Sequence, residues 1–375
     1  MSIKLERKIK IFIQKSLFNI FYFFYPNKKE IPPQKTLKSF SEVKNIQHQE
    51  IYLKTPLKRV LPKSIHESTD KAFIDLVNFE LESDFVMQIP NGRAFGEDGL
   101  VVSEDNQIIS ETLILGGEKL EDHNIFKRYK LPKTIKVNNA ALLTSKWRNC
   151  YYHWIIDVLP KLHLLEKAEI KPEKYILNDY KCTFQVETIA LLGIEEDKII
   201  RLDNESIIEV FNLIVPSLPG SIGNPPLWAC EYLKNKLLIP NVDKFYPEKI
   251  YLSREKAPQR RIQNEDEIFE LLKKYGFKKI IPEDLSMQEQ FNHFANAKII
   301  VSPHGAGLTN LVFSNDKIKV LEIFTPNYIN VCFWALSNLK NIDYFYLKGE
   351  NIPSENFDIF VNIEELEQTL KLMNL

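Results

Sequence analysis

β-forming runs alternate with helical patterns from about residue 140 onwards, and this alternation restricts the fold more than any other feature. "AALLT" (140–144) is typical of a buried strand, residues 151–167 of a helix, and "KYILND" of another strand. "FQVETIALLG" predicts a helix that ends at Gly193, and "DKIIRLD" and "EVFNLIVPS" predict two further strands. Strands that alternate with helices form a mainly parallel sheet. We therefore expect an α/β fold.

A Pro- and Gly-rich stretch, "PSLPGSIGNPP", interrupts this pattern and is followed by a short helical stretch and "IPNVDKFYPEK". The alternation then starts again with "KIYLS", "NEDEIFELLKKYG", "KKII", "KIIVS" and "KVLEIF". Asn264 with Glu267 predicts the cap of a helix that Gly276 closes, and Ser286 with Glu289 predicts the cap of the next helix. Two α/β domains in series follow from this repetition.

The region between residues 50 and 115 has an irregular pattern. Its clearest feature is "GLVVSEDNQIISETLIL", in which two apolar runs flank a short polar stretch. We predict a β-hairpin with Asp105 and Asn106 at its turn.

The composition disfavours several classes of protein. The 375 residues are 44% hydrophobic and 26% charged, as expected for a globular chain with room for two domains. The formal net charge of -1 disfavours a nucleic-acid groove. The cysteines are scattered without a CxxC pair, so we expect a reducing compartment and no structural zinc. They are Cys150, Cys182, Cys230 and Cys332.

The N-terminal 30 residues mix basic side chains with apolar and aromatic ones. Their most apolar part, residues 11–25, is interrupted by polar residues and is shorter than the roughly 20 residues that a spanning helix needs. No small-residue cleavage site follows, so a secretory signal is not expected. We predict a segment that lies on an anionic membrane surface. The alternatives are an amphipathic helix docked on its own domain and an oligomer-forming helix.

Polar residues follow three strands of the second predicted domain, and ligands bind at the carboxyl ends of parallel strands. Glycines let the backbone approach an anion, helix amides near Leu308 would point toward it, and arginines bind phosphate through two nitrogens. A carboxylate could accept hydrogen bonds from a ribose, so the set predicts a nucleoside diphosphate site. A tight structural turn among unrelated surface charges is the alternative. The residues are Arg254, Arg260, Arg261, His304, Gly305, Ala306, Gly307 and Glu322.

Three other enzyme classes are disfavoured. HGG-type loops build oxyanion holes in lipases, but that fold needs a serine on a GxSxG elbow. The sequence contains no such elbow, and "PGSIGN" has the wrong spacing. It contains neither a P-loop nor GxGxxG, which disfavours ATPase and dehydrogenase chemistry.

The first domain contributes "KWRNCYYHWIIDVLPKLHLL", in which His153 and Asp157 are four residues apart. On a helix the two side chains share one face, and Pro160 is expected to bend or divide that helix. Such a pair could take a proton from an attacking hydroxyl. The alternative is structural, with His153 bonded to a buried carbonyl and Asp157 orienting it. The pair has too few ligands for a metal site.

Three blocks occur in order: "YYHWIIDVLPKLHLL", "YLSREKAPQRRIQNEDEIFELLKKYGF", and "IIVSPHGAGLTNLVFS" followed by "KVLEIF". Together they resemble the signatures of glycosyltransferase family 61, whose bacterial members include capsular polysaccharide biosynthesis proteins. The resemblance covers about residues 142–324. It implies the glycosyltransferase B fold, with two Rossmann-like domains facing across a cleft. It also implies an inverting reaction, with the donor bound mainly by the C-terminal domain.

The resemblance assigns His153 and Asp157 to a block that we expect to be catalytic. We therefore expect an inverting enzyme that moves a sugar from a nucleotide sugar to a glycan acceptor in bacterial capsular or surface polysaccharide synthesis. A non-catalytic, membrane-associated nucleotide-sugar sensor or scaffold is the alternative. The residues that match the donor-binding blocks are Arg254, Arg260, His304, Gly305, Ala306, Gly307, Leu308, Thr309, Asn310 and Glu322.

The expected organisation is a membrane-associating segment at residues 1–30, an acceptor-side domain at 31–240 and a donor-binding domain at 241–375. No DxD-type pair stands at a predicted strand end. We expect arginine and helix amides to replace a metal ion, and we expect no cofactor. The expected partners are a nucleotide sugar, a free or lipid-linked glycan and the inner face of the cell membrane, on the cytoplasmic side.

Overall fold

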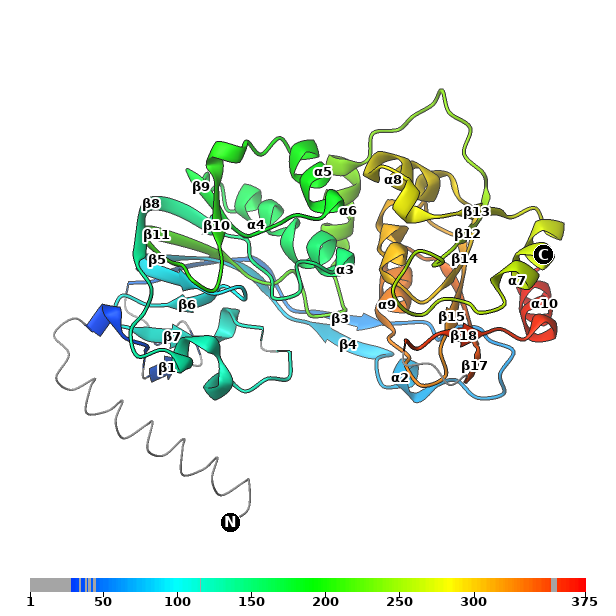
Figure 1. Cartoon of the computed structure of the whole chain (residues 1–375), viewed down its shortest axis with the longest axis horizontal. Coiled ribbons are helices and arrows are strands. Elements are labelled where there is room, and N and C mark those ends of the chain that lie inside the picture. The colour runs from blue at the N-terminus through cyan, green and yellow to red at the C-terminus, as the bar shows by residue number, and fades with distance from the viewer. Residues whose placement is uncertain are drawn as a thin grey trace, which may run out of the picture.

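The structure is a computed structural model with two main β-sheets and helices around them (Figure 1). The predicted membrane segment lies outside the described residues, except for the short 3-10 helix η1 (Lys28–Glu30). No helix in the described part of the chain is both long enough and apolar enough to cross a membrane. The described residues are 28–33, 35–37, 39, 42, 45–114, 116–351 and 356–375.

The first half of the chain forms a mixed nine-stranded sheet. In chain order its strands are β1 (Lys35–Leu37), β2 (Gln47–Tyr52), β5 (Asp84–Phe95), β6 (Leu100–Val102), β7 (Gln107–Ile109), β8 (Thr134–Leu142), β9 (Lys174–Asn178), β10 (Ile199–Leu202) and β11 (Ile207–Pro216). β11, β8, β9 and β10 are parallel neighbours, as the alternation predicts. β11 is antiparallel to β5, which continues the sheet through β6 and β7 to β1. The irregular region of the sequence thus forms the antiparallel side.

The predicted hairpin is confirmed. β6 and β7 pair in the antiparallel direction, with Val102 opposite Ile108. Asn106 at the turn has a φ of 58°, a left-handed conformation that asparagine adopts more readily than most residues. The buried Arg93 donates a hydrogen bond from Nη2 to Asn106 Oδ1 (2.6 Å), so the turn is also fixed from inside the protein.

The helix predicted at residues 151–167 is present but divided. Its parts are α3 (Tyr151–His153), the π-helical turn η6 (Trp154–Val158) and α4 (Lys161–Lys167). Pro160 lies at the junction with α4, as predicted, because proline cannot continue the helical hydrogen bonding. π-helical turns inside helices occur frequently at functional sites. Two longer α-helices of this half are α5 (Thr183–Leu191) and α6 (Leu227–Leu237).

The second sheet consists of five parallel strands. In chain order they are β12 (Lys249–Leu252), β13 (Lys278–Ile280), β14 (Ile299–Pro303), β15 (Lys319–Phe324) and β16 (Asp343–Lys348). Their order across the sheet is β13-β12-β14-β15-β16, with every neighbouring pair parallel. This is a doubly wound order, in which the direction of strand addition reverses beside β12. The strands predicted for this half are confirmed.

Helices cover both faces of this sheet. α7 (Glu265–Lys274) and α10 (Ile363–Leu372) pack on one face, where Leu272 and Leu366 share a core with Leu321. α8 (Met287–Asn296) and α9 (Cys332–Leu339) pack on the other face, in the core that also contains the first half's helices. The two halves therefore share one continuous hydrophobic core on this side.

An N-terminal segment crosses to the second sheet (Figure 1). The antiparallel pair β3 (Thr55–Lys58) and β4 (Asn78–Leu81) flanks it, and the segment contains α2 (Lys71–Ile74). The fully buried Phe73 has its ring 5.4 Å from that of Trp334 and 4.9 Å from that of Tyr346. Part of the predicted domain 31–240 therefore packs on the C-terminal sheet, which the alternation did not indicate.

One predicted helix cap is confirmed in full, and the other is confirmed in its position, because Asn264 is the N-cap residue of α7 and its Nδ2 donates to Glu267 (3.4 Å). Ser286 and Glu289 form the capping box of α8. Asn264 makes no side-chain cap on α7. Its side chain instead donates from Nδ2 to the carbonyl oxygen of Val361 (2.9 Å) and accepts from the Val361 backbone N–H (3.1 Å). A partner distant in sequence has overridden the local pattern.

Phe73→Ala should lower the free energy of unfolding by about 3–5 kcal/mol, because it leaves a cavity beside Trp334 and Tyr346. The next residue, Ile74, is 52% exposed, so Ile74→Ala is a matched control with an expected change within about 0.5 kcal/mol. Urea unfolding measures both. Equal losses in the two variants would contradict the structural role of this segment.

Candidate functional site

Arg254 and the turn that contains Gly305 lie at one edge of the second sheet. They follow β12 and β14, which are parallel neighbours and so end at the same edge. A Cβ added at Gly305 would lie 1.9 Å from Nη1 of Arg254. The φ of Gly305 is 177°, which any residue can adopt, so glycine is needed here for space. Gly305 therefore makes room for the guanidinium of Arg254.

Two arginines concentrate positive charge at this edge. Arg254 donates from Nη2 to the carbonyl oxygen of Gln259 (2.9 Å). Burial, and next the nearby charge of Arg260, lowers the pKa of Arg254 to about 10. The guanidinium of Arg260 lies 5.6 Å from the centre of the Tyr328 ring. An anion near these two groups would relieve their mutual repulsion.

Arg261, the third arginine predicted at this edge, has a different position. It pairs with the buried carboxylate of Asp358 (3.3 Å), and its backbone N–H donates to the same side chain (2.9 Å). This pair fastens the loop after β12 to the segment before α10. Arg261 is therefore a structural residue in this arrangement.

His304 is held by a buried carboxylate. Its Nδ1 is hydrogen-bonded to one carboxylate oxygen of Glu322, and the Tyr344 hydroxyl donates to the other. Glu322 is fully buried, and its contacts in this structure are with His304 and Tyr344, so its predicted contact with a ribose stays a prediction. The ring of Phe324 stacks on the imidazole at a centroid distance of 5.3 Å, which limits rotation of the ring. Glu322 therefore orients His304.

The sequence after Gly305 forms a helix, as predicted, but in 3-10 form: η9 (Ala306–Phe313). Ala306 and Gly307 at its start are half-buried, whereas Leu308 and Thr309 are buried. Thr309 Oγ1 has no hydrogen-bond partner among the described residues. The turn therefore presents its first residues at the sheet edge and directs the following ones into the core.

Asn310 connects the two halves of the molecule. It accepts a hydrogen bond from the hydroxyl of Tyr151 in α3 (2.5 Å) and donates from Nδ2 to Gln290 in α8 (3.1 Å). Asn310 is fully buried, so its predicted role in donor binding becomes indirect. It fixes the glycine turn against the helix that begins the first sequence block.

His153 and Asp157 share one face of their divided helix. His153 Nδ1 lies 2.7 Å from Asp157 Oδ2. The side chain of His153 is 20% exposed and that of Asp157 only 2%. The ring of Trp147 lies against the imidazole, with centroids 4.8 Å apart. The imidazole is therefore the member of the pair that a ligand can reach.

Lys161 lies one turn beyond Asp157 and was missed by sequence reasoning. Its Nζ donates a hydrogen bond to the carbonyl oxygen of Thr144 (2.8 Å). Burial lowers the pKa of Lys161 to about 8, and the negative charge of Asp157 acts in the opposite direction. The spacing of four residues from Asp157 is the sequence signal that could have identified it.

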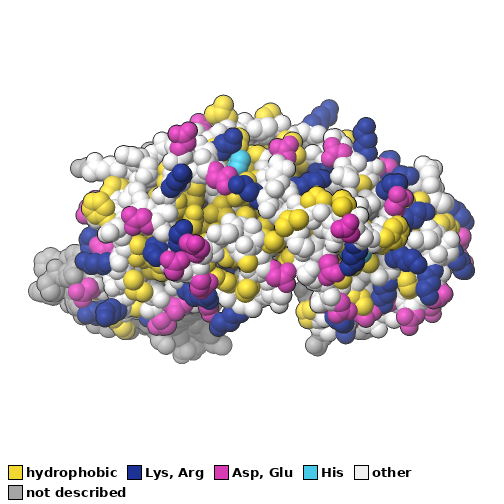
Figure 2. Space-filling view, turned by 90° about the horizontal axis from the view of Figure 1, so that it is seen from above, with side chains coloured by type: hydrophobic (Ala, Val, Ile, Leu, Met, Phe, Trp, Pro, Cys, Tyr) yellow, Lys and Arg dark blue, Asp and Glu magenta, His cyan; other side chains and the backbone are white. Residues whose placement is uncertain are grey.

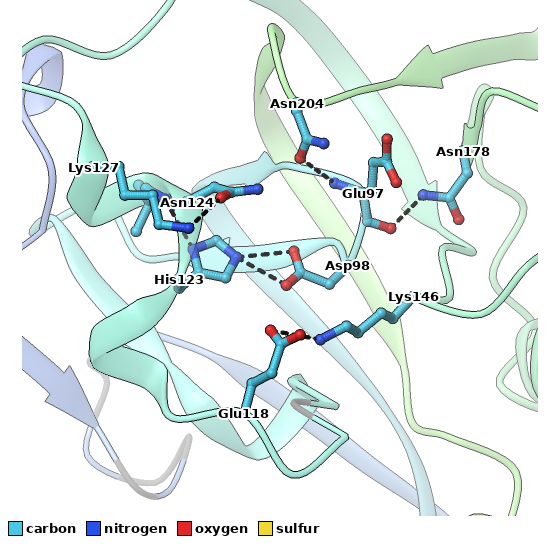
Figure 3. Close-up of polar contacts among 10 residues, drawn as sticks. Glu97, Asp98, Glu118, His123, Asn124, Lys127, Lys146, Asn178 and Asn204 are labelled. Carbon is cyan, nitrogen blue, oxygen red and sulfur yellow. Dashed lines mark hydrogen bonds and ion pairs between the residues drawn. The ribbon is translucent and has the colours of Figure 1, made fainter.

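Polar contacts hold the loop between β8 and α3 and its surroundings, and Figure 3 shows two of them, Lys146 with Glu118 and Asn178 with Glu97. Asn178 at the end of β9 donates from Nδ2 to the carbonyl oxygen of Glu97 (2.5 Å). Arg148 pairs with the side chain of Glu97 (2.6 Å), and Lys146 pairs with Glu118 (2.8 Å). This loop leads directly into α3, so these contacts fix the position of His153.

Aromatic contacts join the His153–Asp157 pair to the glycine turn. The ring of Tyr152 lies 5.4 Å from that of His153 and 5.8 Å from that of Phe333, and Phe333 lies 5.4 Å from His304. Sequence reasoning missed Tyr152 and Phe333 as links, because neither the pairing of their elements nor their facing sides is encoded locally. The structure thus brings the first and third sequence blocks together.

The site fits a defined class of protein. A doubly wound parallel sheet with arginines, an imidazole and a glycine turn at its carboxyl edge is an arrangement of proteins that bind phosphorylated ligands. Within the described ranges, no group of three or more His, Cys, Asp or Glu side chains is placed to hold a metal ion. The glycosyltransferase 61 family model matches residues 151–321. The resemblance to this family is therefore confirmed over that part of the chain.

Parts of the chain are similar to curated sugar transferases. A β-1,2-xylosyltransferase of Oryza sativa is 33% identical over 87 residues, which are 23% of this chain and 16% of the relative. An EGF domain-specific O-linked N-acetylglucosamine transferase of Drosophila melanogaster is 28% identical over 152 residues, 36% of this chain and 29% of the relative. A β-1,2-xylosyltransferase of Arabidopsis thaliana is 24% identical over 125 residues, 30% and 23% of the two chains. The matches span less than a third of each relative.

Gly305→Ala should lower the free energy of unfolding by about 1–3 kcal/mol, because the added methyl group overlaps the guanidinium of Arg254. In an Arg254→Ala background the same change should cost less than about 0.5 kcal/mol, since the obstacle is gone. Urea unfolding of the two single variants and the double variant gives the coupling between the sites. Additive effects would show that the two groups are not in contact.

The lowered pKa of Lys161 should make stability depend on pH. The folded value is about 8 and the ordinary value is 10.5, so the unfolded chain binds more protons between them. Lys161 should therefore make the free energy of unfolding increase as the pH rises from about 7 to about 10. In Lys161→Met this increase should be smaller by about 1–3 kcal/mol. Urea unfolding at several pH values measures it, with the exposed Lys171→Met as control. Identical pH profiles for wild type and Lys161→Met would contradict this prediction.

Proposed function

We propose that the protein is an inverting glycosyltransferase that moves a sugar from a nucleotide-sugar donor to a glycan acceptor. The observation that supports this most directly is the adjacency of two unlike groups of residues within residues 151–321. The His153–Asp157 pair suits proton removal. The carboxyl edge of the second sheet, with Arg254, Arg260 and His304, suits a diphosphate and is called the cationic edge. Both lie inside the part of the chain that matches the glycosyltransferase 61 model.

The proposed architecture is of the glycosyltransferase B type, with two Rossmann-like domains facing across a cleft. The all-parallel second sheet and the parallel strands β8 to β11 of the first sheet support it. The outline of the molecule is indented between its two halves in the space-filling view (Figure 2). Donor would bind on the C-terminal side and acceptor on the N-terminal side, and closure would exclude water that could hydrolyse the donor.

The proposed reaction is a single displacement. An acceptor hydroxyl attacks the anomeric carbon, the bond from that carbon to the diphosphate oxygen breaks, and the hydroxyl proton passes to the enzyme. His153 is the better acceptor of this proton, because it is the more exposed member of the pair. With Nδ1 held by Asp157, its Nε2 can face the hydroxyl, and Asp157 then stabilises the imidazolium.

Negative charge collects on the leaving diphosphate. Arg254, Arg260 and His304 are placed to stabilise it by charge and hydrogen bonding, which is the role a divalent cation has in other transferases. We therefore propose that turnover needs no metal ion and no cofactor. The half-buried start of η9 adds backbone amides at the same edge.

The acceptor and the location are further proposals. We propose a surface or capsular glycan of a bacterium, free or lipid-linked, on the basis of the sequence resemblance; the curated relatives named above are eukaryotic. The basic, amphipathic residues 1–30 would place the enzyme on the cytoplasmic face of the membrane. Acidic and basic side chains are interspersed on the face seen in Figure 2, in keeping with a small ligand rather than a nucleic acid.

Asp157→Asn and His153→Ala should lower kcat by about 10²–10⁴ while leaving nucleotide binding within about twofold, because the pair acts on the acceptor proton. Arg254→Ala should instead weaken nucleotide binding. Transfer from UDP-, GDP-, CMP- and dTDP-sugars to a panel of glycans measures kcat, and thermal shift measures binding.

His163→Gln is the control for His153→Ala and Asp157→Asn. His163 lies on α4, and its Nε2 is hydrogen-bonded to the hydroxyl of Tyr52 (2.8 Å) rather than to His153 or Asp157. Turnover in EDTA at the wild-type rate is expected. If His153→Ala and Asp157→Asn both keep wild-type turnover, this pair does not supply the general base. A wild-type protein that binds a nucleotide sugar without any transfer would instead indicate a sensor.

A further inference from the structure

Two aromatic rings stand exposed beside the cationic edge. Tyr328 lies in the tight turn after β15, where its N–H donates to the Thr325 carbonyl oxygen (3.3 Å), and it is 42% exposed. Phe357 is 50% exposed and its ring lies 6.3 Å from that of Tyr328. On the inner side, Tyr328 lies 5.7 Å from the ring of His304. Large aromatic side chains left in solvent at the carboxyl edge of a parallel sheet indicate a surface that a ligand covers.

Arg260, one of the two arginines at this edge, lies beside the Tyr328 ring, and its backbone conformation is unusual. Its φ is 59°, in the left-handed region that residues other than glycine rarely adopt, and the φ of Phe357 is 56°. The backbone N–H of Arg260 donates to the Asn356 carbonyl oxygen (2.9 Å), so the two strained loops hold each other. Such strain persists where the surroundings impose it and concentrates at functional sites.

The guanidinium of Arg260 has one N–H donor that no described residue accepts from. Its Nε is buried and has no hydrogen-bond partner among the described residues, although buried guanidinium N–H groups are normally paired. The same guanidinium lies 5.6 Å from the centre of the Tyr328 ring. A ligand that offers both a flat ring and an anionic oxygen would satisfy these two features together.

We propose that Tyr328, with Phe357 beside it, stacks the base of a nucleoside diphosphate, while Arg260 contacts the phosphate that follows. This inference rests on the proposed function and adds the base subsite to it. Aromatic rings hold bases through their faces, and this works for any base, so the subsite secures the nucleotide without selecting it by itself. The diphosphate then extends past His304 toward Arg254, and the sugar lies nearer to Tyr152 and His153.

Other exposed aromatic residues do not share these features. Phe245 is 85% exposed in the segment between α6 and β12, and Phe211 lies exposed within β11. Among the described residues, neither ring lies beside an arginine or an imidazole at a strand end of the second sheet. Phe245→Ala is therefore a matched control for removal of an exposed aromatic ring.

The test compares ligands with and without a base. Isothermal titration of the full chain with UDP, GDP and inorganic pyrophosphate gives Kd values for wild type, Tyr328→Ala, Tyr328→Phe and Phe245→Ala. Tyr328→Ala should weaken UDP and GDP by about ten- to hundredfold and pyrophosphate by less than about twofold. Tyr328→Phe and Phe245→Ala should bind all three as wild type does.

Two results would overturn the base subsite while leaving the proposed function intact. One is wild-type affinity of Tyr328→Ala for both nucleotides; the other is an equal loss of pyrophosphate, which would make Tyr328 a support of the phosphate site. Wild-type protein that binds none of the three ligands would overturn the donor site itself. If Tyr328→Ala is unfolded in a thermal melt, Tyr328→Leu replaces it, because leucine keeps apolar volume without an aromatic face.

Discussion

All five strands of the C-terminal sheet run in one direction, and the arrangement of the site depends on this constraint. Parallel strands end at one edge, so the turns after β12, β14 and β15 meet there although they are far apart in the chain. Arg254 can reach across to Gly305 only because the two turns are neighbours, and Tyr328 reaches His304 for the same reason. An antiparallel arrangement of the same strands would place these groups at opposite edges.

The two halves of the molecule contact each other directly at the site, in addition to being connected along the chain. The hydrogen bond from Tyr151 to Asn310 and the ring contacts through Phe333 connect the first sequence block directly to the glycine turn. The segment that contains Phe73 adds a second connection, because the Phe73 ring lies against those of Phe324 and Tyr346 in the C-terminal sheet. A displacement of either half would therefore move His153 relative to Arg254 and His304, so the packing between the halves sets the geometry of the site.

The sequence predicts the second sheet well because its signals are local. Short apolar runs bounded by caps, glycines and prolines define each strand and helix, and the spacing of His153 and Asp157 defines their shared face. Three features depend on partners distant in the chain: the position of Phe73 on the second sheet, the hydrogen bond of Asn264 to Val361 and the burial of Glu322. No local pattern records which distant segment will lie opposite, so these features could not be predicted.

Both halves hold charge where water has little access. Burial lowers the pKa of Arg254 to about 10 and that of Lys161 to about 8, and Arg260 adds repulsion and a left-handed backbone beside Arg254. Buried charge destabilises the folded state unless a partner compensates it, and such groups concentrate at functional sites. A diphosphate would supply the missing negative charge between the arginines. The features that weaken the free protein at this edge therefore favour an anionic ligand over a neutral one.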